Sequence, residues 1–174
     1  MPQRVALPGA MRRIAFLRAV NAGGHTIRMA DLRASFEGLG FESLESNEEN
    51  LERVIERGLE AAYGYPIETF IRSLAELAEI AARDPFGRID PANDGRSVFV
   101  AFMDRRPTEA AIKRLTALAT DDDAFAVVGR EAYWLRRGGM GTSKFSSGFL
   151  EKTLGVPATL RGLPTVAKIV ARYG

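Results

Sequence analysis

One glycine-rich loop carries residue types that are well suited to hold an anion. The segment 138–144, Gly-Gly-Met-Gly-Thr-Ser-Lys, follows an expected strand and opens an expected helix. Free backbone N–H groups and the positive end of the helix converge at such a place. Gly141, Ser143 and Lys144 are therefore candidate contacts for a phosphate or carboxylate group. A plain strand-to-helix connection, capped by Ser143 or Ser146, explains the same residues equally well.

A second loop near the N-terminus could serve the same ligand. Arg18 follows an apolar strand, Asn21 tolerates left-handed backbone, and Gly23 and Gly24 allow a ligand to approach the main chain closely. Arg161 could add a cationic fork. If the two halves of the chain pack together, both loops would line one cleft, which is a usual place for a small ligand. A tight turn and a surface arginine are the alternatives.

The sequence offers little other catalytic or metal-binding chemistry. It contains no cysteine, which excludes disulfides, thiolate nucleophiles and cysteine-ligated metals and suits a cytoplasmic protein. His25 is the only histidine, so a histidine-rich metal site is excluded, and any Ser-His-acid triad would have to use it. The run Asp121-Asp122-Asp123 fits an acidic turn before a strand better than a cation site. We predict no metal and no cofactor, and whether a reaction is catalysed stays open.

The composition is that of an ordinary globular protein. Of 174 residues 46% are apolar and 26% charged, and the net charge of +2 makes only a weak case for nucleic acid. No apolar run approaches the roughly 20 residues of a membrane helix, and no secretory signal is expected at the N-terminus. The lysines are Lys113, Lys144, Lys152 and Lys168, and arginine makes up the rest of the 24 cationic residues.

The pattern of apolar residues predicts two strands and three helices in the first half. The strands are expected at 14–17 and 67–72, where apolar and β-branched residues cluster. Serine–glutamate pairs three residues apart form capping boxes that open two of the helices. These pairs are Ser46 with Glu49 and Ser73 with Glu76. The remaining helix is expected to bury Met29, Leu32, Phe36 and Leu39.

The second half has a fuller pattern. Strands are expected at 98–103, 125–128, 133–135 and 158–161, with helices between the first two, between the last two, and at 163–173. Gly129 begins the turn of the central hairpin. The order β-α-β-β-α-β-α is that of a ferredoxin-like, split β-α-β unit with a trailing helix. Such units include single-strand-binding modules, but Phe99, Tyr133 and Trp134 are expected in the core rather than on an open sheet face.

We therefore expect an α+β protein made of two pseudo-repeated ferredoxin-like lobes. The expected boundaries are a loose extension at 1–11, a first lobe at 12–87, a linker at 88–96 and a second lobe at 97–174. The element orders of the lobes match if one hairpin is inserted between the first two helices. Only a short run after Leu39 lies there, so the first lobe is expected to lack its central hairpin.

Several separated motifs resemble the bacterial domain-of-unknown-function family 1697. They are Ala15–Gly24, Met29–Leu32, Gly141–Phe145, Leu154–Thr159 with Arg161, and Thr165–Lys168. This resemblance covers the chain from about Met11 to its C-terminus and implies no activity, because none is established for the family. Family members usually have glycine where Ala19 stands and an aromatic-polar pair where Leu163 and Pro164 stand.

The resemblance also implies a gap. Members carry a hairpin with a Ser-Gly-Asn-Val-like motif between the first two helices, which would follow Gly40 here and leave Phe41–Ser43 as its last residues. A natural deletion, a faulty gene boundary and a segment omitted from the sequence are alternatives. The loss would also leave an exposed sheet edge, which invites pairing with another chain.

The leading functional hypothesis is a non-enzymatic module that binds a phosphate- or carboxylate-bearing small molecule, or a partner, between its lobes. Alternatives are an interaction protein that forms a homodimer through an exposed sheet edge, an enzyme of unknown reaction, and a weak nucleic-acid binder. No contact with a membrane is expected.

Overall fold

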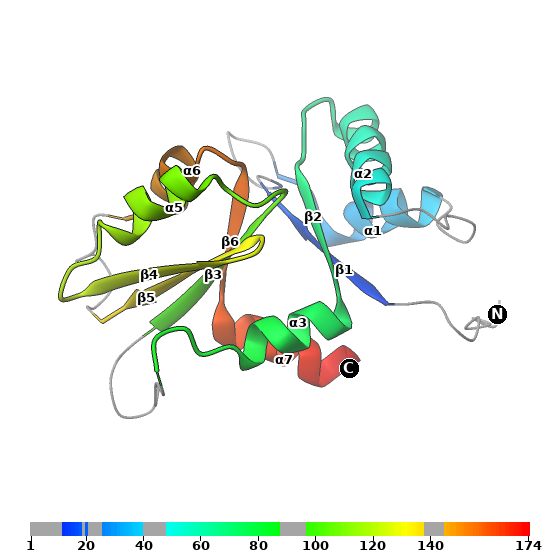
Figure 1. Cartoon of the computed structure of the whole chain (residues 1–174). Coiled ribbons are helices and arrows are strands. Elements are labelled where there is room, and N and C mark those ends of the chain that lie inside the picture. Colours follow the sequence, from blue (N-terminus) through cyan, green and yellow to red (C-terminus); the bar gives the residue numbers. More distant parts are fainter. Residues whose placement is uncertain (1–11, 19, 21–25, 40–47, 88–96, 138–144) are drawn as a thin grey trace.

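The computed structural model shows a mixed α+β protein with two antiparallel sheets (Figure 1). It describes residues 12–18, 20, 26–39, 48–87, 97–137 and 145–174, and the predicted hairpin gap at 40–47 lies outside them. The described elements are β1 (Arg13–Leu17), α1 (Met29–Gly38), α2 (Glu48–Tyr63), β2 (Thr69–Ser73), α3 (Leu74–Ala82), β3 (Ser97–Met103), α5 (Glu109–Thr116), β4 (Asp123–Val128), β5 (Glu131–Arg136), α6 (Ser147–Leu154), β6 (Ala158–Gly162) and α7 (Leu163–Tyr173). We call residues 12–87 the first half and residues 97–174 the second half.

The second half forms a four-stranded sheet that is covered on both faces. Its strand order is β4-β5-β3-β6 and every neighbouring pair is antiparallel. Because side chains alternate along a strand, Ala101 and Trp134 face α5 and α6, while Phe102 and Tyr133 face the first half and α7. Trp134 and Tyr133 are buried, as predicted. This sheet therefore has no open aromatic face of the kind that single-stranded nucleic acid requires.

The first half forms a smaller sheet of two described strands, β1 and β2. One face packs on α1 and α2 through an apolar cluster that includes Leu32, Leu59 and Ile71. The other face turns Phe16 and Phe70 toward the second half, where they join the same cluster as Phe102. The centre of the molecule is thus a layer shared by the two sheets.

The two central strand pairs have matching register. In the first half Ile14 lies opposite Arg72, and in the second half Val100 lies opposite Arg161. From there the β1–β2 pairs and the β3–β6 pairs run in parallel, residue by residue, to the ends of β1 and β3. The last β1–β2 pair, Leu17 with Thr69, therefore corresponds to the β3–β6 pair Met103 with Ala158. Each pair leads directly into a helix, α3 or α7, and these two helices pack against each other (Figure 1).

Glutamates cover the outer edge of β2. Glu56 and Glu52, one turn apart on α2, accept hydrogen bonds from the backbone N–H groups of Thr69 (2.8 Å) and Ile71 (2.7 Å). Glu76 accepts from the N–H of Ser73 within the predicted capping box, whose two bonds are both present. The outward N–H groups of β2 therefore have partners, which argues against pairing of another chain at this edge.

The expected buried face of α1 and the expected helix caps have different outcomes. Met29 was expected on the buried face of its helix but is 74% exposed; it is the first residue of α1, whose buried residue is Leu32 in the next turn. Ser146, one of the two predicted caps, accepts the N–H of Phe149 and opens α6. The predicted cap at Ser46 lies outside the described residues.

We predict that Glu52→Gln is stabilising at neutral pH, whereas Glu52→Leu is destabilising. Burial raises the pKa of Glu52 above its ordinary 4.5 although the Ile71 N–H opposes this, so the neutral carboxyl favours the folded state. That contribution is complete below pH 4.5 and is lost as pH rises through the folded pKa. Glutamine stays neutral and still accepts the N–H, while leucine leaves it unpaired at about 1–3 kcal/mol.

The measurement is urea unfolding of both variants between pH 4 and 8. The gain of the glutamine variant over the wild type should grow with pH. A difference between these two proteins that is independent of pH would contradict the assignment.

Candidate functional site

The two halves meet at a pair of stacked aromatic rings. Phe16 on β1 and Phe102 on β3 lie with ring centroids 4.2 Å apart and planes inclined by 15°. Both side chains are buried, so the stack excludes water from the junction. These phenylalanines occupy matching positions in the two strand pairs. The junction is therefore built from the same residue type on each side.

Arg72 places a buried guanidinium beside this stack. Its side chain is fully buried, with Nη2 donating to the Met103 carbonyl (2.9 Å) and Nη1 to the Ile71 carbonyl (2.7 Å). Nε donates to Glu131 at 2.7 Å, and the charge lies 5.6 Å from the centre of the Phe102 ring. A charge can be buried only when it is paired and hydrogen-bonded, and Arg72 meets both conditions with groups of the second half.

Arg161 makes the corresponding contacts in the opposite direction. Its Nη2 donates to the Leu17 carbonyl of the first half (3.0 Å) and its Nη1 donates to the Leu160 carbonyl (2.7 Å). Its charge lies 5.9 Å from the centre of the Phe16 ring. The described residues give Arg161 no carboxylate partner, and burial lowers its pKa. Each half thus sends one arginine to a strand-end carbonyl of the other.

Arg18 is also occupied by protein groups. Its Nη2 donates to Glu151 at 2.8 Å, and its Nη1 forms an ion pair with Glu68. Burial disfavours its charge, but the hydrogen bonds and charges of Glu68 and Glu151 raise the pKa of Arg18. Glu151 also accepts the N–H of Ala158 (2.9 Å), so this cluster fastens the end of β1 to the start of β6.

The predicted site is therefore only partly described. Arg18 and Arg161 lie on the same side of the junction, because Arg161 binds the carbonyl of the residue that precedes Arg18. The other predicted ligand contacts lie outside the described residues: Asn21, Gly23, Gly24, Gly141, Ser143 and Lys144. The two described arginines serve the junction, and their grouping with the glycine loops stays a prediction.

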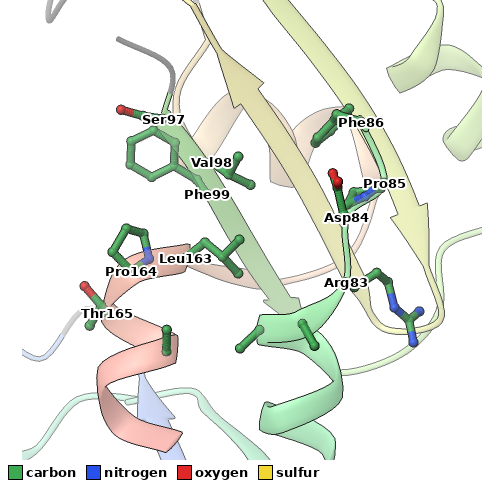
Figure 2. Close-up of a pocket in the computed structure, with 14 residues that line it drawn as sticks. Arg83, Asp84, Pro85, Phe86, Ser97, Val98, Phe99, Leu163, Pro164 and Thr165 are labelled. Atoms are coloured by element: carbon green, nitrogen blue, oxygen red, sulfur yellow. The ribbon is translucent and has the colours of Figure 1, made fainter. Parts of the chain in front are cut away.

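A cavity of about 680 Å³ opens between the halves, at the far end of the junction from Arg18. We call it the junction cavity; Figure 2 shows its walls, which come from the end of α3, the segment after it, the start of β3 and the start of α7. Val98 and Leu163 point into this space, and the charged end of Arg83 points away from it (Figure 2). The lining is mainly apolar and includes Ala81, Ala82, Pro85, Phe86, Val98, Phe99, Leu163, Pro164 and Ala167.

The positive end of a helix lies at the wall of this cavity. Gly162 is the N-cap residue of α7, and a glycine has no side chain that could accept a hydrogen bond from the first turn. Pro164, in that turn, has no N–H group. In this first turn the N–H of Leu163 faces Val98 across the β3–β6 strand pair, and the N–H of Thr165 has no partner within the helix. Among the described residues, Ser97, Arg83 and Asp84 add the other polar groups.

Other kinds of site find no support in the described part of the chain. Its Asp, Glu and His residues form no group of three or more that could hold a metal ion. None of the described helices is long and apolar enough to cross a membrane. Asp123, from the acidic run, accepts the indole N–H of Trp134 at 2.6 Å and is buried, so it anchors a core side chain.

Sequence reasoning missed Arg72, Glu52 and Glu56. A usable signal was present, because Thr-Phe-Ile-Arg-Ser at 69–73 and Ala-Thr-Leu-Arg-Gly at 158–162 place an arginine at the same point of a strand that leads into a helix. Comparison of the two halves in this register would have singled out the arginine pair. No such signal marks the cavity, since its walls come from segments about 80 residues apart.

We predict that Arg72→Leu destabilises the protein more than Arg161→Leu. Removing Arg72 leaves Glu131 and the Met103 carbonyl without their partner, and breaking a buried ion pair costs about 3–5 kcal/mol. Removing Arg161 leaves the Leu17 and Leu160 carbonyls and the Thr159 hydroxyl, which are neutral groups, at about 1–3 kcal/mol. Urea unfolding measures both changes. Equal losses, or a larger loss for Arg161→Leu, would contradict the assigned contacts.

Comparison with known proteins agrees with the resemblance in the sequence. The family model described as a protein of unknown function (DUF1697) matches residues 11–47 and 41–133, which together span well over half of the chain. The two stretches meet where the sequence predicts a missing hairpin. The hairpin's loss itself stays a prediction.

A solved structure has a similar fold. It is described as the structure of conserved bacterial protein SP0830 from Streptococcus pneumoniae; it shares 21% sequence identity with this chain and a TM-score of 0.67, covering 94% of this chain and 98% of that one. No curated protein matches the sequence. The chain belongs to the DUF1697 family of proteins of unknown function.

Proposed function

We propose that the protein is a non-enzymatic module that binds a small molecule with an apolar body and an anionic head in the junction cavity. The observation that carries this proposal is the cavity itself, which has about 680 Å³ of space and walls from both halves. Small-molecule sites commonly have about 300–1,000 Å³, a mainly apolar lining and a few polar groups that fix orientation. The junction cavity has these features.

The nature of the head group follows from the start of α7. Its first turn has no side-chain cap and offers the N–H group of Thr165, and the helix dipole favours negative charge there. Asp84 lies in the wall across the cavity from α7 (Figure 2) and would repel an anion beside it. The anionic head group is therefore expected at the start of α7 and not near Asp84. A carboxylate at this place gains about 0.3–1 kcal/mol over a neutral group, which corresponds to a roughly two- to five-fold difference in affinity.

We also propose that the two halves are repeats of one ferredoxin-like unit. The equal register of the strand pairs, the exchanged arginine contacts and the packing of α3 on α7 support a common plan. If the halves are repeats, β1 corresponds to β3. β3 pairs with β5 on one edge and β6 on the other, whereas β1 pairs only with β2 among the described strands. The proposed loss of a hairpin from the first half accounts for this difference.

The binding proposal predicts that 4-phenylbutyrate binds more tightly than 4-phenylbutan-1-ol, which differs only in the head group. NMR titration of backbone amides measures both affinities, and the amide of Thr165 should be among those that shift most. Ala167→Leu should weaken both ligands at least ten-fold, because leucine fills part of the cavity.

Ala110→Leu is the matched control, since Ala110 is an exposed helical alanine on α5, outside the cavity. It should leave both affinities unchanged. Absence of saturable binding for both probes, or equal weakening by the two leucine variants, would contradict the proposed site.

A further inference from the structure

A second space between the halves has a very different lining. This polar cleft of about 720 Å³ lies between α2, the start of β2 and the end of β3. Four carboxylates and three arginines line it together with Thr69, Phe70 and Pro157; the charged residues are Glu52, Glu56, Glu68, Asp104, Arg53, Arg105 and Arg130. The polar cleft shares no lining residue with the junction cavity.

The register of the strands relates this cleft to the Arg18 cluster. Arg18 is the residue after β1, and Asp104 is the residue after β3. Glu56 accepts the N–H of Thr69, as Glu151 accepts the N–H of Ala158 at the corresponding position of β6. Arg18 beside Glu151 and Asp104 beside Glu56 therefore occupy matching places in the two halves.

The charges at these matching places are opposite. Beside Glu151 the residue after the strand is a cation, and its guanidinium bridges Glu151 and Glu68. Beside Glu56 the residue after the strand is an anion. Burial raises the pKa of Glu56 although the Thr69 N–H opposes this, and the negative charges of Glu68 and Asp104 raise it further.

Two arginines of the cleft, Arg105 and Arg130, already pair with carboxylates, and the partner of Arg105 is Asp104 inside the cleft. Arg105 pairs with its neighbour Asp104 at 2.6 Å, but its side chain is 63% exposed, and exposed pairs are worth little. Arg130 pairs with Glu76 at 3.4 Å. Glu68 already holds Arg18. Glu56 is thus a half-buried carboxylate that faces two other carboxylates, beside enough space for a ligand.

We propose that the polar cleft binds a small organic cation, with a guanidinium or primary ammonium group between Glu56 and Asp104. The group would take the place that corresponds to that of the Arg18 guanidinium beside Glu151. This inference rests on the proposed repeat of the two halves, but not on a ligand in the junction cavity. The Arg18 cluster supplies the internal example of how such a cation is held.

Titration with agmatine, which carries a guanidinium and a primary ammonium group, tests the proposal. Binding should be saturable in 150 mM salt, and the backbone amide of Thr69 should be among the most shifted in NMR spectra, because Glu56 accepts its hydrogen bond. n-Butylamine and n-butanol separate the ammonium group from the chain: the amine should bind more weakly than agmatine at the same amides, and the alcohol should not bind.

Two variants locate the site. Glu56→Gln keeps an acceptor for Thr69 but removes the charge, and it should weaken agmatine at least ten-fold. Asp104→Arg places a guanidinium of the chain itself where we expect the ligand, so it should abolish binding and leave the protein folded. Asp121→Asn, at an exposed acidic residue outside the cleft, should leave the affinity unchanged.

The titrations of the three variants distinguish a specific site from general attraction to charge. Loss in the first two variants alone supports the site. No saturable binding, or equal weakening by all three variants, overturns it, since the latter would indicate attraction to net charge only. Either result leaves the phenylbutyrate test of the junction cavity unaffected.

Discussion

The structure depends on two arginines that cross between its halves, Arg72, which is buried, and Arg161, which is half-buried. Arg72 reaches from the first half to the Met103 carbonyl, and Arg161 reaches from the second half to the Leu17 carbonyl. Between them lie the stacked rings of Phe16 and Phe102. A guanidinium that leaves water must keep its hydrogen bonds, so neither half can move away without exposing the stack and leaving a charge unpaired. This constraint fixes the geometry of both spaces between the halves.

Both candidate sites are consequences of that junction. The packing of α3 on α7 leaves the junction cavity at one end, with the positive end of α7 in its wall. At the other end the residues that follow β1 and β3 approach helices of the opposite half. There the matching register of the central strand pairs makes a difference in charge informative, because a cation follows β1 at Arg18 and an anion follows β3 at Asp104.

Local features of this fold could be predicted from the sequence, whereas contacts between the halves could not. The apolar run at 98–103, the turn at Gly129 and the capping box of Ser73 depend on neighbouring residues, and each lies where expected. The carboxylates of Glu52 and Glu56 accept hydrogen bonds from backbone N–H groups of β2, a strand that follows their helix in the chain. The spacing of apolar residues in α2 therefore could not predict this role. Arg18 and Arg161 were predicted as ligand contacts; the structure gives both of them protein partners, and neither lines the junction cavity.

Native-state hydrogen exchange would show whether the arginine junction makes the two halves one cooperative unit. The amides of Phe70 in the first half and Phe102 in the second belong to different sheets but to one core cluster. They should exchange through a single opening with the same free energy, and Arg72→Leu should lower that free energy equally at both. Two distinct opening free energies, or an effect of the variant on Phe70 alone, would contradict the account.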